Sequence, residues 1–175
     1  MKKQTIFFDI DGVLIEADNI RIENYKEISR EMLKLSESPD YGGSAWIFKK
    51  LKGLYDKGVV IDPKHYKMID IRLPIILKAL KEKYKLIACS KASVEMSNRK
   101  LKATDIAKYF DKVIEKPIPD IYGKFILVDD RYTAGFCNRD NAYIIKFYHG
   151  QHKEESKDYD AVITDLGELI DLLND

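Results

Sequence analysis

The chain has 175 residues, 45% of them hydrophobic and 34% charged, which fits one ordinary globular domain with room for a modest insertion and excludes a largely disordered chain. The formal net charge of +1 gives no strong evidence for nucleic acid as a partner, and the two cysteines lack the spacing of a disulfide framework or a zinc site. Apolar runs are too short to cross a bilayer and no signal-peptide core follows Met1, so we expect a cytoplasmic protein without a membrane partner.

The first predicted element is a buried strand over residues 5–8, which leads into Asp9, Asp11 and Gly12. Side chains two apart on an extended segment point the same way, and Gly12 permits the backbone to bend, so the two carboxylates can converge. One carboxylate can then attack a substrate while its neighbour moves a proton. Aspartates in such a place can also be simple turn formers that hydrogen-bond their own backbone.

A segment of different character follows the first strand. Apolar residues recur at three- and four-residue spacing over 22–35 and again over 47–55, and Asp62-Pro63 can begin a third helix. We therefore predict a small helical insertion, residues 16–75, within a core domain made of residues 1–15 and 76–175. Such an insertion can cover a site and exclude water, although a purely structural appendage is the alternative.

The rest of the chain alternates short apolar runs with helical patterns. A helix is predicted after Ser90, and a last helix opens with a capping box formed by Asp165 and Glu168. Further strands are predicted at residues 86–89, 113–114, 125–128, 143–147 and 161–163. This alternation predicts an α/β fold with a doubly wound parallel sheet, whose ligands bind at the carboxyl ends of the strands.

The connection between the predicted strands at 113–114 and 125–128 is unusual. Only residues 117–123 are available between the lysine that closes one strand, Lys116, and the start of the next. Extended chain at about 3.3 Å per residue can cover the distance, whereas a crossover helix cannot. We therefore expect a connection without a helix.

Polar residues follow the strand ends at which a doubly wound sheet places its site. They are Asp9 with Asp11, Ser90 with Lys91, Lys116, and Asp129 with Asp130. Ser90 can equally be the N-cap of the next helix, and Asp129-Asp130 can be turn formers.

Several lysines compete for a role at this edge of the sheet. Lys124 precedes the end of its strand by roughly 17 Å at about 3.3 Å per residue, and Lys112 likewise stands at the start of its own strand. Lys116 stands at the correct end and is the preferred candidate, with Lys91 in reserve.

Together and in this order, the four signals resemble the haloacid dehalogenase (HAD) superfamily, and the resemblance covers most of the chain. In that family a D-x-D-G strand end is followed by a Ser or Thr, a lysine and an acidic pair. The resemblance implies a Rossmann-like, doubly wound core, and the segment 16–75 is similar to the family's small α-helical cap.

The resemblance also implies a role for each residue. Asp9 would be the nucleophile that becomes an aspartyl phosphate, and Asp11 the acid and base. Ser90 and Lys91 would bind the phosphoryl group, and Lys116 would neutralise both the nucleophile and that group. Mg²⁺ would be held by Asp9, the backbone carbonyl of Asp11, and one or both of Asp129 and Asp130.

These roles imply a Mg²⁺-dependent phosphomonoester hydrolase that acts on a small phosphorylated metabolite. Asp11 favours this activity, because dehalogenases of the superfamily do not use a second aspartate there. The string 128–131 resembles a motif of polynucleotide phosphatases and some deoxynucleotidases, so a nucleotide is one candidate substrate, although Arg131 can simply balance charge. The alternatives are a sugar-phosphate mutase of the same fold and a non-catalytic binding module; no oligomeric state is indicated.

Overall fold

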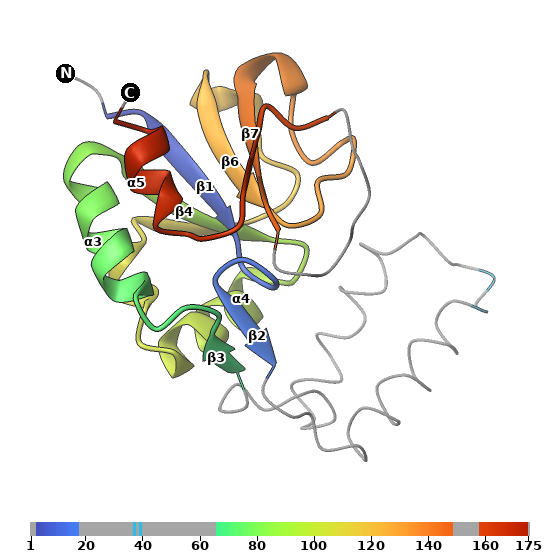
Figure 1. Ribbon diagram of the computed structural model, residues 1–175. Helices are drawn as coiled ribbons and strands as arrows, with labels where there is room; N and C mark the ends of the chain where they lie inside the picture. Colours follow the sequence, from blue (N-terminus) through green and yellow to red (C-terminus); the bar gives the residue numbers. More distant parts are fainter. Residues whose placement is uncertain (1–2, 18–36, 38, 40–65, 149–157, 175) are drawn as a thin grey trace.

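The computed structural model describes residues 3–17, 37, 39, 66–148 and 158–174 (Figure 1). Its main element is a six-stranded parallel sheet with the order β5-β4-β1-β6-β7-β8. The strands are β1 (Thr5–Asp9), β4 (Lys85–Ser90), β5 (Lys112–Glu115), β6 (Phe125–Asp129), β7 (Ala142–Phe147) and β8 (Ala161–Ile163). All six predicted strands are confirmed. From β1 the chain builds outward through β4 and β5 on one side and later through β6, β7 and β8 on the other, which confirms the doubly wound α/β fold.

The sheet has a buried core on each face, because alternate side chains of a strand point to opposite sides. In β1, Ile6 and Phe8 join one apolar cluster, whereas Phe7 joins the other. Both faces of the central strands are therefore covered, and β1 and β6 are almost continuously apolar, as expected for buried parallel strands. Only the residues at the ends of these strands are free to carry polar chemistry.

Three α-helices of the described residues cover the first of these faces, the one that holds Ile6 and Phe8. They are α3 (Leu73–Lys83), α4 (Val94–Ala103) and α5 (Glu168–Leu172). The Ser93 hydroxyl caps α4 by accepting from the N–H of Met96, so Ser90 is not the N-cap. Among the residues that the structure describes, no helix combines the length and the apolar character needed to span a membrane.

The predicted capping box of the last helix is present in a modified form. Oε1 of Glu168 accepts from the N–H of Asp165 at 2.8 Å, which is one half of the box. The Asp165 carboxylate accepts instead from the N–H of Gly167 at 2.6 Å, and α5 begins only at Glu168. The helix is therefore shorter than its apolar pattern predicts.

The connection from β5 to β6 contains no α-helix, as predicted. It includes only the short 3-10 helix η3 (Asp120–Tyr122), and Ile118 packs into the second apolar cluster beside β5 and β6. The N–H of Lys116 donates to the carbonyl of Ser90 at 2.8 Å, so the end of β5 stays joined to the end of β4. This bond holds Lys116 at the carboxyl edge of the sheet.

A two-stranded antiparallel ribbon, which the sequence did not predict, follows the turn after β1. It pairs β2 (Ile15–Ala17) with β3 (Tyr66–Met68), and Figure 1 shows it beyond the carboxyl end of β1. Asp62 and Pro63, where a helix was predicted to begin, lie outside the described residues, and the described segment that comes next is held extended in β3 by its pairing with β2. The core helix α3 begins at Leu73, before residue 76 at which the predicted core resumes. The predicted helices at 22–35 and 47–55 lie outside the described residues.

Candidate active site

Three carboxylates gather where two neighbouring strands end. Phe8 of β1 lies opposite Val128 of β6, so Asp9 and Asp129 leave the sheet side by side. Oxygen atoms of Asp9, Asp129 and Asp130 lie within 4.8 Å of one another. The order of strands in the sheet, rather than proximity in the sequence, creates this cluster.

The turn after β1 brings its backbone against the same cluster. The N–H groups of Leu14 and Ile15 both donate to the carbonyl of Ile10, and Gly12 adopts a φ of +85°. A side chain at Gly12 would collide with the carboxylate of Asp130. Glycine is therefore required twice over, by its backbone conformation and by the close approach of Asp130. The turn leaves the Asp11 side chain half exposed, at 48%.

Lys116 provides the positive charge inside the cluster. Its Nζ atom lies 2.7 Å from Oδ1 of Asp9 and 2.6 Å from Oδ2 of Asp129, and its side chain is only 4% exposed. The other oxygen of Asp129, Oδ1, accepts from the N–H of Arg131 at 2.8 Å. Lys116 is thus the lysine that the fold brings to the two acids. Lys112 begins β5 and Lys124 precedes β6, so both lie at the far edge of the sheet.

Burial and neighbouring charges shift the pKa values of Asp9 and Lys116. The ammonium of Lys116 contacts Asp9 and Asp129, and burial, together with the neighbouring charge of Asp129, raises the pKa of Asp9 to about 8 even though Lys116 acts in the opposite direction. Burial alone would lower the pKa of Lys116, but the carboxylates of Asp9 and Asp129 more than offset this and raise it. The three carboxylates of Asp9, Asp129 and Asp130 offer only oxygen ligands, which fits a hard divalent cation such as Mg²⁺.

Ser90, Lys91 and Lys116 lie on the neighbouring strand ends. Ser90 is buried, and its Oγ accepts from the N–H of Ala92 at 3.1 Å in the loop that follows β4. The Nζ atoms of Lys91 and Lys116 lie 4.5 and 4.3 Å from the centroid of the Phe136 ring. Burial, and then the charges of Lys116 and Arg131, lower the pKa of Lys91. Positive groups therefore gather beside the carboxylates, which suits an anionic substrate.

A second lysine, Lys100 of α4, contacts Asp11 and was not predicted from the sequence. Its Nζ atom lies 2.8 and 2.9 Å from the two carboxylate oxygens of Asp11 and 4.6 Å from the centroid of the Tyr66 ring. Burial alone would lower the pKa of Lys100, but Asp11 and Tyr66 outweigh burial and raise it. One feature of the sequence could have indicated that Lys100 is buried: it precedes the apolar Leu101 on one side of an amphipathic helix.

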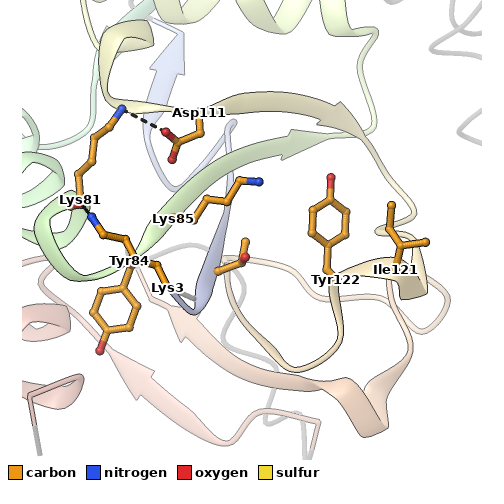
Figure 2. A pocket seen from close by; sticks show the side chains of 8 residues that line it. Lys3, Lys81, Tyr84, Lys85, Asp111, Ile121 and Tyr122 are labelled. Atoms are coloured by element: carbon orange, nitrogen blue, oxygen red, sulfur yellow. Dashed lines mark hydrogen bonds and ion pairs between the residues drawn. The ribbon is translucent and has the colours of Figure 1, made fainter. Parts of the chain in front are cut away.

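A cavity of about 520 Å³ lies at the opposite edge of the sheet (Figure 2). Its lining includes Thr5 and Lys85, the first residues of β1 and β4, and the pair Lys81–Asp111. The carboxylate cluster lies at the other ends of these strands. The cavity is therefore separate from the candidate active site.

Comparisons with solved structures identify the fold. A HAD phosphatase from Thermococcus onnurineus superposes with a TM-score of 0.65 at 21% identity, over 99% of this chain and 98% of that one. A haloacid dehalogenase-like hydrolase from Streptococcus pneumoniae gives 0.64 at 15% identity over 98% of both chains. An L-2-haloacid dehalogenase from Xanthobacter autotrophicus gives 0.64 at 14% identity over 99% of both chains.

At this level of identity the comparisons establish the fold, and proteins of different activity share it. No protein-family model matches the chain, and no curated protein matches it either. The resemblance drawn from the four sequence signals is confirmed for the fold. The chain therefore has the haloacid dehalogenase fold.

Proposed function

We propose that the chain is a Mg²⁺-dependent phosphomonoester hydrolase that works through an aspartyl-phosphate intermediate on Asp9. The observation that carries this proposal is the convergence of Asp9, Asp129 and Asp130, with the ammonium of Lys116 in contact with the first two. Asp11 follows Asp9 on the same turn and remains half exposed. A binding module would have no physical need for so much like charge in one place.

Two transfers make up the reaction. In the first, a carboxylate oxygen of Asp9 attacks phosphorus, the ester P–O bond breaks, and Asp11 gives its proton to the leaving oxygen. In the second, Asp11 takes a proton from water, the resulting hydroxide oxygen attacks phosphorus, and the bond to Asp9 breaks. Phosphate leaves, and Asp9 and Asp11 return to their starting states.

The other residues bind and orient the phosphoryl group. The ammonium of Lys116 holds Asp9 in place and balances charge on the transferring group, while the Ser90 hydroxyl and Lys91 bind its outer oxygens. Asp9, the backbone carbonyl of Asp11, and Asp129 with Asp130 would hold Mg²⁺. The ion would reduce the repulsion between an anionic nucleophile and an anionic substrate.

The test is hydrolysis of nitrophenyl phosphate with and without Mg²⁺. We expect turnover that depends on the metal, and loss of at least about 10³-fold in Asp9→Asn, whose amide cannot form the aspartyl phosphate. The melting curve of Asp9→Asn should stay cooperative, so that the loss reflects chemistry. Full activity of Asp9→Asn would remove Asp9 from the role of nucleophile.

A panel of phosphate esters would identify the substrate class and separate the alternatives. It should include sugar phosphates and nucleoside monophosphates, since the string 128–131 suggests the latter. A mutase would move the phosphoryl group to a sugar hydroxyl in preference to water. An absence of both turnover and transfer across the panel would favour a binding module.

A further inference from the structure

Lys100 forms a two-pronged contact with the residue proposed as acid and base. Its ammonium reaches both oxygens of Asp11, at 2.8 and 2.9 Å, from a helix that is distant in sequence. The Lys100 side chain is 7% exposed, whereas that of Asp11 is 48% exposed. The lysine therefore approaches from the protein interior and leaves one side of the carboxylate open to a substrate.

The surroundings of Lys100 restrict where its ammonium can go. Lys100 shares the buried side of α4 with Met96 and Leu101, and the ring of Tyr66 lies 4.6 Å from Nζ. Tyr66 begins β3, so the contact joins three separate segments: the turn after β1, helix α4 and the ribbon β2–β3. A lysine held on several sides can hold its partner in one orientation.

Stability alone does not explain a lysine at this position. Burying an ammonium is unfavourable, and apolar residues of similar volume commonly stabilise a fold as well as a buried ion pair does. The neighbours of Lys100 on this side of α4 include Leu101, which is fully buried, so an apolar residue would pack there. The contact with Asp11 is the distinctive feature of the lysine.

We propose that Lys100 is a positioning residue that holds the carboxylate of Asp11 in the orientation needed for proton transfer at the leaving oxygen. This inference rests on the proposed phosphatase function and extends it to a residue outside the strand-end motifs. Lys100 does not touch the reacting atoms; it acts through Asp11. Tyr66 supports it from the side of the insertion.

The test compares two esters whose leaving groups differ in their need for a proton. An alkyl phosphate such as glycerol phosphate needs an acid, whereas dinitrophenyl phosphate does not. Because kcat/KM covers the steps up to departure of the leaving group, we expect Lys100→Met to lower it about 10- to 100-fold for the alkyl ester and less than about 3-fold for the dinitrophenyl ester.

Three further variants test whether the selective loss arises from the contact between Lys100 and Asp11. Lys102→Met removes an exposed lysine from the same helix and should leave both esters at wild-type rates. Lys100→Gln keeps a polar side chain of similar length and should repeat the selective loss with a smaller change in packing. In the background of Asp11→Asn, Lys100→Met should cause no further loss, since the two residues act as one unit.

The outcomes separate this inference from the proposed function. Equal losses for both esters, or an additional loss in the Asp11→Asn background, would overturn the positioning role while leaving an active phosphatase. An absence of hydrolysis by the wild-type protein would overturn the proposed function and this inference with it. Melting curves of each variant show that the comparison is made on folded protein.

Discussion

The Nζ atom of Lys116 lies 2.7 Å from Oδ1 of Asp9, the proposed nucleophile. The same atom also reaches Asp129 on the neighbouring strand. These side chains come from three strand ends that the sheet brings together, and β1 lies between the other two. A buried ammonium is thus shared by two buried acids, which ties the charge balance of the site to the stability of the fold.

Lys116→Met should destabilise the metal-free protein by about 3–5 kcal/mol, because it leaves two buried carboxylates without their cation. Mg²⁺ should then raise the melting temperature more in the variant than in the wild type, since the metal replaces part of the missing charge. Thermal unfolding in chelator and in Mg²⁺ measures both effects. Lys112→Met, which changes an exposed lysine at the start of β5, serves as the control. An unchanged melting temperature in chelator would contradict the coupling.

Gly12→Ala should weaken Mg²⁺ binding, because its new methyl group would displace the carboxylate of Asp130. Isothermal titration with Mg²⁺ measures the affinity. Gly123→Ala is a matched control, since Gly123 also has a positive φ, of +64°, but has open space around its Cβ position. Both variants should lose about 1–2 kcal/mol of stability through backbone strain, and only Gly12→Ala should lose metal affinity. Equal Mg²⁺ affinity in the two variants would contradict the role of Gly12.

The strand ends could be predicted because local patterns determine them. Each strand is an apolar run, and β1 places Ile6 and Phe8 on one face and Phe7 on the other. A polar residue that follows such a run must lie at an edge of the sheet. Lys116 could be selected on the same ground, from its position at the carboxyl end of β5.

The contact between Lys100 and Asp11 could not be predicted in this way. The two residues are 89 positions apart, and the packing of α4 against the turn after β1 brings them together. A lysine on a helix is ordinarily exposed, so the helical pattern alone does not predict that Lys100 is buried. The ribbon β2–β3 was missed for a related reason, because each strand has only three residues and its partner is distant in the sequence.

Ser90→Ala should weaken binding of inorganic phosphate about 10-fold, if the hydroxyl contributes one hydrogen bond to a phosphoryl oxygen. Inhibition of ester hydrolysis by phosphate measures this change. Ser93→Ala is the matched control, since the Ser93 hydroxyl caps α4 and its loss should cost about 1 kcal/mol of stability. Ser93→Ala should leave phosphate inhibition unchanged. If both variants weaken phosphate binding equally, the effect reflects the shape of the loop and not the Ser90 hydroxyl.

Asp160, which lies away from the candidate active site, should make the stability of the fold depend on pH. Its carboxylate accepts from Arg139 at 2.8 Å and from the N–H of Ile144 at 2.7 Å. The bond from Arg139 is the main cause of a lowered pKa for Asp160, the N–H of Ile144 adds to it, and partial burial opposes both. A pKa that is lower in the folded state means that the ionised group stabilises the fold above its unfolded pKa, and that this contribution is lost as the pH falls through the folded value.

Asp160→Asn should therefore melt at a lower temperature than the wild type at neutral pH, and the difference should shrink as the pH falls below 3.8, the ordinary pKa of an aspartate. The asparagine keeps the shape of the side chain but not the charge that the Arg139 guanidinium contacts. Melting curves over this pH range measure the change. Asp171→Asn removes an exposed carboxylate on α5 and controls for net charge. A constant difference between Asp160→Asn and the wild type across the range would contradict a contribution from the ionised form of Asp160.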